Sequence, residues 1–235
     1  MISTFHNVGK QTLSFETNML RDVQQRNIAR DKYLSQCRET NIVKPCYVNN
    51  GAFYLGESMQ ENAVYFGKNS FYNVVRSLGG KWADSKDRPI VCLMKLSEND
   101  DICWAIPVGN WNHRDENGKN RIEKYLKYNE NDIRSCYYHL GRVDVVTSIF
   151  FVSDIVPITD KYIEREYLGV YSKKIYIIKN KELLSELQRK VKRILAWENS
   201  NPNSFRQHIT DIKNFLNQEL QATQEAAVTN ICEDI

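Results

Sequence analysis

The C-terminal third of the chain carries two helical stripes of apolar residues in succession, and these limit the folds open to it. In residues 181–198 (KELLSELQRKVKRILAWE) apolar side chains recur every three or four positions, as on a helix with one buried face. A second stripe follows the turn NSNPN, with Ser204 as the predicted N-cap and Gln207 at the third helical position. Each apolar face must pack against another part of the chain, and the preceding residues must supply that part.

Three apolar runs upstream predict the strands of a sheet that provides this cover. Residues 88–96 (RPIVCLMKL) and 102–108 (ICWAIPV) are separated by a short polar turn, which favours an antiparallel hairpin. The third run, 143–158, is longer than most strands and predicts a bend near Ser153 and Asp154. The expected fold class is α+β, a compact SH3-like antiparallel β-barrel closed by the two C-terminal amphipathic helices.

Composition divides the chain into three parts around one core. Residues 1–87 predict an N-terminal extension packed on the core, with a helix from about Phe15 to Arg38 followed by short strands. Residues 88–220 form the predicted barrel with its terminal helices, and residues 221–235 a flexible acidic tail. A length of 235 residues is compatible with a single core.

Targeting signals and cysteine spacing limit the cellular location and the kinds of covalent or metal cross-link that we expect. The sequence has no run of eighteen apolar residues, and its start lacks the pattern of a signal peptide, so we expect a cytoplasmic protein without membrane contact. Its six cysteines include no CxxC pair. Neither a zinc site nor a disulfide framework is therefore expected.

The polar loop after the second run concentrates reactive side chains. Asn110, Trp111, His113 and Arg114 lie within five positions. An imidazole can transfer a proton near neutral pH, a guanidinium can stabilise a phosphate that gains charge, and an indole can stack on a base. These groups suit RNA cleavage through the 2′-hydroxyl. The alternative is a surface loop whose side chains only cap turns.

A second cluster, Tyr137, His139 and Arg142, precedes the third run. On an alternating strand Tyr137 and His139 face the same side, so we take them as further catalytic candidates and Arg142 as an RNA contact. The alternative is a cross-strand aromatic patch in which His139 bonds to the backbone.

The segment from Lys173 to Arg193 is basic, although the net charge of the chain is only +3. Lys190 and Arg193 of this segment are candidate contacts to an RNA backbone, because phosphate binding depends mainly on positive charge. A solvated helix face explains the same pattern.

Several motifs are missing from the sequence. It contains no GxxxxGK[ST] loop, no GxGxxG after a strand, no GxSxG and no HExxH, and its acidic pairs lie in predicted turns. We therefore expect neither a metal ion nor another cofactor.

The order of these elements resembles the ToxN and AbiQ toxins of type III toxin–antitoxin systems, which are compact barrels of the MazF and PemK kind. The resemblance covers about residues 88–220 and is anchored on Ile106-Pro107, on residues 155–158 (IVPI) and on the basic helix pair. It implies a phage-defence module in which a sequence-selective endoribonuclease cleaves single-stranded RNA without metal and leaves a 2′,3′-cyclic phosphate. A structured antitoxin RNA would occupy its groove, and a small acidic protein antitoxin is the alternative.

The active-site motif of these toxins is not present in this chain. They follow the strand-ending proline with hydroxyl residues and a lysine, whereas Pro107 is followed by Val108, Gly109, Asn110 and Trp111. No catalytic residue can be carried over at these positions. His113 and Arg114 are the local substitutes, and Ser204 is a candidate groove hydroxyl.

Two other functions fit the same sequence. The chain could be a non-catalytic barrel that binds RNA or a protein, or an interaction protein whose N-terminal helix docks on another chain. A homo-oligomer and a complex with an antitoxin are both compatible with the sequence.

The absent metal-ligand patterns give a first testable prediction. RNA cleavage should persist in EDTA, because proton transfer by a side chain needs no divalent ion. An assay on single-stranded RNA with and without the chelator measures this. Activity that is lost in EDTA and restored by magnesium would contradict the proposed chemistry.

Overall fold

A computed structural model describes residues 47–48, 51–52, 59–82, 88–96 and 99–233. The chain divides into two compact units, 1–55 and 56–235. In the first unit, β1 (Tyr47–Val48) pairs antiparallel with β2 (Gly51–Ala52). The helix predicted from Phe15 to Arg38 lies outside the described residues.

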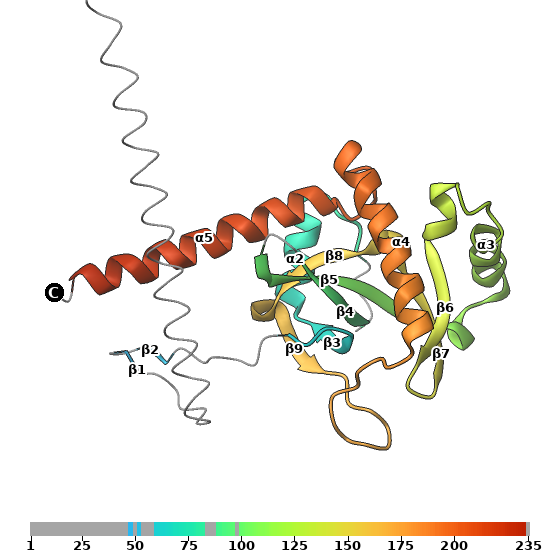
Figure 1. Ribbon diagram of the computed structural model, residues 1–235, viewed down its shortest axis with the longest axis horizontal. Helices are drawn as coiled ribbons and strands as arrows, with labels where there is room; N and C mark the ends of the chain where they lie inside the picture. The colour runs from blue at the N-terminus through green and yellow to red at the C-terminus, as the bar shows by residue number, and fades with distance from the viewer. Residues whose placement is uncertain (1–46, 49–50, 53–58, 83–87, 97–98, 234–235) are drawn as a thin grey trace, which may run out of the picture. The chain divides into compact units, whose positions relative to one another are not determined.

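The second unit is an α+β fold with an antiparallel sheet (Figure 1). The described strands follow the order β6-β7-β5-β4-β3-β9, and β8 pairs with β5 beside this path. This order has two ends, so the predicted closure into an SH3-like barrel is not confirmed. The strands are β3 (Ala63–Gly67), β4 (Pro89–Leu96), β5 (Asn99–Asn110), β6 (Tyr138–Val143), β7 (Val146–Phe151), β8 (Val156–Thr159) and β9 (Ile163–Glu166).

The long third run of the sequence forms two strands. β7 and β8 are separated by the 3-10 helix η3 (Val152–Asp154), where the sequence predicted a bend. β7 pairs with the end of β5 at Val108–Asn110, whereas β8 pairs with the earlier stretch Ile102–Ala105. One edge of β5 therefore has two successive partners.

A continuous segment after η3 contacts two non-adjacent strands. β8 pairs with β5, the 3-10 helix η4 (Asp160–Tyr162) follows, and β9 then pairs with β3. The amide of Lys68 donates to the carbonyl of Tyr162 at 2.8 Å where the segment turns. The segment thus connects two strands, β5 and β3, that are separated by β4 in the sheet.

Residues placed in the predicted N-terminal extension belong to the core. β3 and α2 (Asn69–Ser77) lie in the same unit as the rest of the sheet, and Val64 and Phe71 are fully buried. The predicted boundary between residues 87 and 88 therefore cuts through one packed core. The short strand AVYFG completes the sheet as the partner of β4.

The first predicted closing helix is α4 (Lys181–Ser200). The side chain of Asn180 caps it by accepting from the Leu183 amide at 3.0 Å. Leu187, Val191 and Ile194 are fully buried, which confirms the predicted apolar face.

The second helix, α5 (Ile209–Glu233), begins later than predicted. Ser204 does not cap it; instead the buried carboxylate of Glu198 accepts from the Thr210 amide at 3.1 Å and from its hydroxyl at 2.6 Å. The helix also continues through residues 221–233, where a flexible tail was predicted. The first turns of α5 pack in the core through the buried side chains of Ile209, Ile212 and Leu216.

The cysteine prediction is wrong for one pair. Cys92 in β4 and Cys103 in β5 form a disulfide, and both are almost fully buried. The two residues lie on adjacent strands beside a register shift, so their side chains meet although they are eleven residues apart. Cys136 is a buried free thiol.

The buried face of α4 can be tested with one charge. Leu187→Asp should unfold the protein, because an unpaired carboxylate in a core costs several kcal/mol. Ser185→Asp, on the exposed side of the same helix, should keep a near-native melting temperature. A melting curve for Leu187→Asp that matches the wild type would contradict the packing of this helix.

Candidate active site

The loop that the sequence singled out begins where β5 ends. Asn110 caps the 3-10 helix η1 (Trp111–His113), because its side-chain oxygen accepts from the Asn112 amide at 2.8 Å. The Asn110 amide nitrogen lies 3.3 Å from Nε2 of His113. An amide nitrogen donates, so in this arrangement Nε2 accepts and the neutral ring carries its proton on Nδ1. The end of β5 thus orients an exposed imidazole.

Two guanidinium groups flank one aromatic ring beside this loop. The Cζ atoms of Arg114 and Arg88 lie 5.0 Å and 5.5 Å from the ring centroid of Phe151 in β7. Such cation–π contacts hold the guanidinium planes in place. Burial, and then the positive charge of Arg114, lower the pKa of Arg88 from its usual value. Two neighbouring cations of this kind favour the binding of an anion.

Gly109 makes this arrangement possible. A Cβ atom at this position would lie 3.0 Å from the Phe151 ring and 3.1 Å from Nη2 of Arg114. Any larger residue would therefore push the ring or the guanidinium aside. The missing side chain thus lets the ring and the guanidinium approach the strand this closely.

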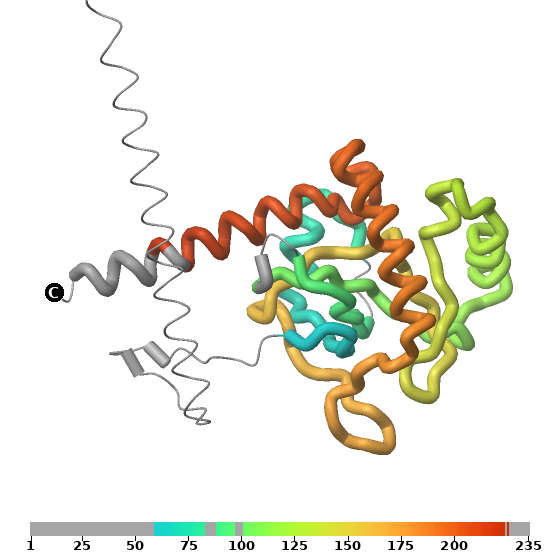
Figure 2. Tube along the Cα trace, in the orientation of Figure 1, coloured from blue at the N-terminus to red at the C-terminus, as the bar shows by residue number. Residues whose placement is uncertain are grey.

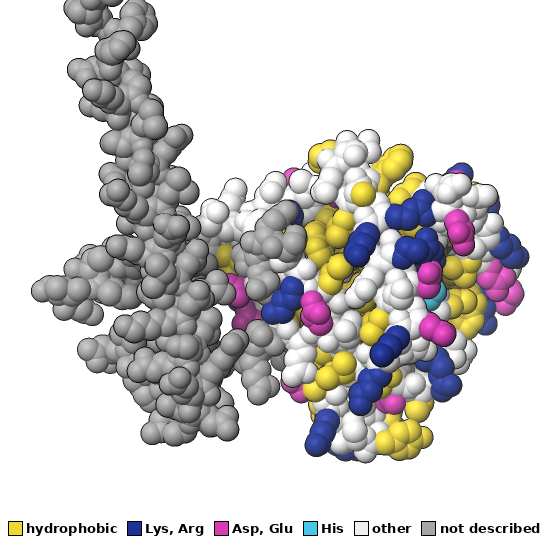
Figure 3. All heavy atoms as spheres, in the orientation of Figure 1, with side chains coloured by type: hydrophobic (Ala, Val, Ile, Leu, Met, Phe, Trp, Pro, Cys, Tyr) yellow, Lys and Arg dark blue, Asp and Glu magenta, His cyan; other side chains and the backbone are white. Residues whose placement is uncertain are grey.

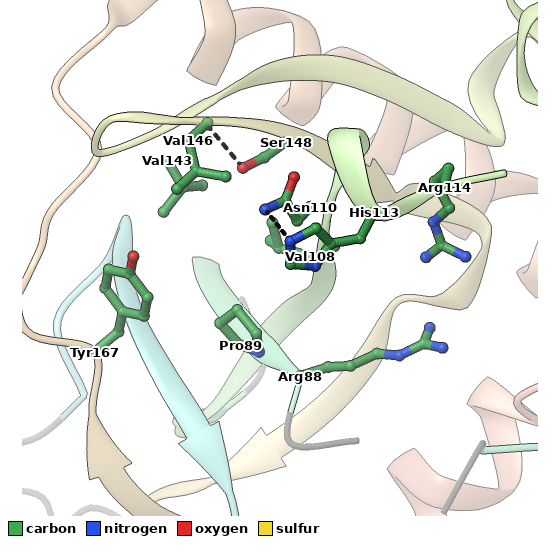
Figure 4. A pocket seen from close by; sticks show the side chains of 11 residues that line it. Arg88, Pro89, Val108, Asn110, His113, Arg114, Val143, Val146, Ser148 and Tyr167 are labelled. Atoms are coloured by element: carbon green, nitrogen blue, oxygen red, sulfur yellow. Dashed lines mark hydrogen bonds between the residues drawn. The ribbon is translucent and has the colours of Figure 1, made fainter. Parts of the chain in front are cut away.

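These groups surround a cavity of about 320 Å³, which we call the His113 cavity. In the view of Figure 4, Arg88 and Arg114 point to one end, Tyr167 stands at the other, and His113 and Asn110 lie between them. Within the described part of the chain, no Asp or Glu side chain lines it. The lining residues are Arg88, Pro89, Val108, Gly109, Asn110, His113, Arg114, Val143, Val146, Ser148 and Tyr167.

Further charged residues lie beside the cavity. Nε of Arg206 is 3.3 Å from a carboxylate oxygen of Asp154, and the Arg206 guanidinium also donates to the carbonyl of Lys81 at 3.0 Å. Burial raises the pKa of Asp154, while Arg206 opposes this shift. Asp154 raises the pKa of Arg88 and Arg206 lowers it by a smaller effect, so charges of both signs act on this end of the cavity from beyond the lining residues.

The second predicted cluster does not join this site. Tyr137 ends the 3-10 helix η2 (Ile133–Cys136) and stacks on Tyr125, with ring centroids 5.4 Å apart. His139 lies in β6 and faces α4, where burial and then Lys190 lower its pKa to about 4. It is therefore neutral at pH 7 and cannot act there as a proton donor.

His139 and Arg142 line a different hollow, together with Glu186 of α4. Arg142 lies on β6, and its guanidinium donates to the Val145 carbonyl at 3.4 Å. The two residues predicted to accompany Tyr137 thus contribute to a surface separate from the His113 cavity.

Lys190, a predicted RNA contact, has a structural role instead. Its side chain is buried, and its ammonium donates to the carbonyls of Ser135 at 2.9 Å and Tyr138 at 2.7 Å. Burial lowers its pKa. An ammonium held in this way ties α4 to the start of β6 and does not face RNA.

Arg193 and Ser204 are also engaged within the fold. The Arg193 guanidinium donates to the carbonyls of Glu130 and Asn131, the latter at 3.0 Å. The Ser204 hydroxyl donates to Glu198 at 3.4 Å. Neither residue lines the His113 cavity.

The basic segment before α4 remains exposed. Residues 167–181 include four lysines and no carboxylate. Residues 167–180 form a loop between β9 and α4, closed by a bridge from Leu168 to Ile175 (Figure 2), and Lys181 begins α4. Lys and Arg side chains gather on the face over α4 and this loop (Figure 3). This surface carries the positive charge that the sequence predicted.

Sequence reasoning missed Arg88, Ser148 and Tyr167. Arg88 stands directly before a strand and Ser148 inside one, so neither belongs to a polar cluster in the sequence. Tyr167 follows the run Glu164–Glu166 and gives no signal by itself. Only strand pairing brings these side chains to the loop of His113.

Comparisons with known proteins do not assign the chain to a family. No family model matches the chain, and no curated protein matches it. In the described ranges, no group of three or more His, Cys, Asp or Glu residues could hold a metal ion. No helix in the same ranges is long and apolar enough to cross a membrane.

Burial of His139 gives a prediction for stability against pH. The unfolded chain binds a proton below about pH 6.5, whereas the folded chain excludes it down to about pH 4. The free energy of unfolding should therefore fall as the pH drops through this window, with about 1 kcal/mol from this residue by pH 4.5, because the ring is only partly buried and solvent screens its charge. Urea unfolding of wild type and His139→Gln at pH 7 and 4.5 measures it. An equal loss in both proteins would contradict a buried neutral His139.

Proposed function

We propose that this protein is a metal-independent endoribonuclease that cleaves single-stranded RNA in the His113 cavity. The observation that carries the proposal is the placement of one exposed imidazole between two guanidinium groups and an aromatic ring. An anion is favoured there because arginines line the cavity and, among the described residues, no carboxylate does. RNA supplies the anion, the ribose and the base that such a site can bind.

The proposed reaction uses the 2′-hydroxyl of the RNA as nucleophile. His113 accepts the proton of this hydroxyl at Nε2, where the 2′-hydroxyl displaces the Asn110 amide as the hydrogen-bond donor, and the 2′-oxygen forms a bond to phosphorus. The bond from phosphorus to the 5′-oxygen of the next nucleotide breaks, and that oxygen takes a proton from a water molecule, whose hydroxide then recovers the proton held by His113. The products are a 2′,3′-cyclic phosphate and a free 5′-hydroxyl. Arg88 and Arg114 stabilise the additional charge on phosphorus in the transition state.

The biological role follows from the ToxN-like resemblance and is part of the proposal. The enzyme acts as a toxin of a toxin–antitoxin or phage-defence module, and a structured antitoxin RNA fills its groove in the restrained state. We also interpret the sheet as a partly open barrel of the MazF type. The segment 156–166 supports this, since it pairs with β5 through β8 and with β3 through β9.

A non-catalytic RNA-binding module is the second candidate. It is favoured by the fact that, of the described side chains that line the cavity, His113 is the single imidazole and no carboxylate is present to act as a second acid or base. Binding through Arg88, Arg114 and Tyr167 needs no proton transfer. Cleavage assays separate the two candidates.

The catalytic role of His113 can be tested by its removal. His113→Ala should slow single-turnover cleavage of single-stranded RNA by roughly 100-fold or more, because general base catalysis contributes at least this factor. The affinity for RNA should stay near the wild-type value. Asn112→Ala is the matched control, since Asn112 lies in the same loop, is exposed and does not line the cavity.

Arg114→Ala distinguishes phosphate binding from proton transfer in the same assay. It should weaken both affinity and cleavage, since a guanidinium contacts phosphate in the ground state and in the transition state. Normal cleavage by His113→Ala would contradict the proposed mechanism. RNA binding without cleavage by the wild type would favour the binding module.

A further inference from the structure

The loop between β9 and α4 is ordered by its own backbone and by the neighbouring turn between β6 and β7. A carboxylate oxygen of Asp144 in that turn accepts from the Val170 amide at 2.7 Å. The Gly169 amide donates to the Lys174 carbonyl at 2.9 Å, and the Lys173 amide donates to the Gly169 carbonyl at 3.0 Å. The loop, which projects from the sheet in Figure 1, therefore presents its side chains from a hydrogen-bonded backbone.

This backbone leaves an aromatic ring and three cations exposed. Tyr171 is 83% exposed, the highest fraction among the large apolar and aromatic side chains that are exposed in the described ranges. Lys173, Lys174 and Lys179 are exposed as well. None of these lysines forms an ion pair with another described residue. Their charge is therefore available to an anionic ligand.

Part of this surface is a hollow of about 480 Å³, which we call the Tyr171 hollow. Its lining includes Tyr171, Tyr176, Lys174 and Lys179. Among the described residues, the one carboxylate in the lining is that of Asp144, which already accepts from the loop backbone. A single-stranded nucleic acid offers bases to aromatic rings and phosphates to ammonium groups. The hollow thus combines the two kinds of group that such a strand requires.

The Tyr171 hollow and the His113 cavity lie on the two sides of one wall. Tyr167 lines the cavity and Tyr176 lines the hollow, and their rings meet edge-on with centroids 6.3 Å apart. Val143 and Val146, which flank the turn that carries Asp144, also line the cavity. This proximity favours RNA as the ligand of the hollow, because a strand with one phosphate in the cavity has further bases and phosphates on either side.

We propose that the Tyr171 hollow is a second RNA-binding site, which holds nucleotides of the same strand outside the cleavage point. This inference rests on the proposed function, since RNA in the His113 cavity brings the strand to the hollow. Tyr171 stacks on a base, and Lys174 and Lys179 contact phosphates. RNA that is too short to reach the hollow lacks these contacts, so the hollow makes the protein prefer longer strands.

Binding of 2′-O-methyl oligoadenylates of two lengths tests the hollow without cleavage. Wild-type protein should bind an oligomer of about twelve nucleotides at least tenfold more tightly than a trinucleotide, as measured by fluorescence anisotropy. Tyr171→Leu keeps apolar bulk but removes the ring, and it should weaken binding of the long oligomer by roughly tenfold. Its affinity for the trinucleotide should stay at the wild-type value, which excludes a folding defect. Tyr171→Phe keeps the ring and should bind both oligomers as wild type does.

A double variant, Lys174→Ala with Lys179→Ala, tests the phosphate contacts. For the long oligomer, the slope of log affinity against log salt concentration should become shallower by about 1.4, because each phosphate contact on a single strand contributes about 0.7. Lys124→Ala with Lys127→Ala is the matched control. It removes the same charge from α3 (Glu116–Leu126) and its C-cap, outside the cavity and the hollow, and should keep the wild-type slope.

Two results would overturn the inference, namely an unchanged affinity of Tyr171→Leu for the long oligomer and an unchanged salt dependence in the double variant at Lys174 and Lys179. A polyglutamate peptide provides the competing ligand. If the double variant loses affinity for this peptide but binds the long oligomer as wild type does, the surface binds an acidic protein instead. The partly exposed side chains of Leu168 and Val170 would then add apolar contacts.

Cleavage of the corresponding unmodified RNA oligomers distinguishes this inference from the proposed function. If wild type binds with the expected length preference but cleaves neither oligomer, the second binding site stands and the ribonuclease proposal fails. If wild type cleaves the long oligomer and the loop variants bind it as wild type does, the ribonuclease proposal stands and the second binding site fails.

Discussion

β5 changes its pairing partner along one edge, and the candidate site depends on this change. Its earlier stretch pairs with β8 and its last residues with β7. The switch places Phe151, the last residue of β7, beside Gly109 near the end of β5. Because Gly109 has no side chain, the ring and the Arg114 guanidinium can both approach the strand. The loop with His113 then starts from a fixed position.

The site gathers positive charge at the edge of a buried aromatic core. Two guanidinium groups rest against Phe151, and burial with mutual repulsion lowers the pKa of Arg88. Among the described residues no carboxylate lines the cavity, so a bound anion would relieve the repulsion between these two cations. Tyr167 stands at the end of the cavity opposite to the two guanidinium groups (Figure 4).

The two C-terminal helices and the principal strands could be predicted because their patterns are local. The stripe with Leu187 and Val191 has the period of a helix, and both residues are buried. β3 was predicted only as one of several short strands of the N-terminal extension, because five residues among Asn and Gly give too short an alternation to fix its bounds. The disulfide between Cys92 and Cys103 was missed, since it depends on the register of β4 against β5. Closure of the sheet likewise depends on pairing, which periodicity does not encode.

The sequence by itself determined the loop that carries His113 and Arg114, because neighbours in the chain stay close in any fold. Only the tertiary structure decided which other residues join them. Strand pairing brings Arg88 and Tyr167 to the loop from distant parts of the chain. His139 packs against α4 and does not join the His113 cavity. Its pKa falls to about 4 because its charged form is poorly solvated there. Proximity across strands and burial are properties of packing, and a linear pattern of residue types does not specify them.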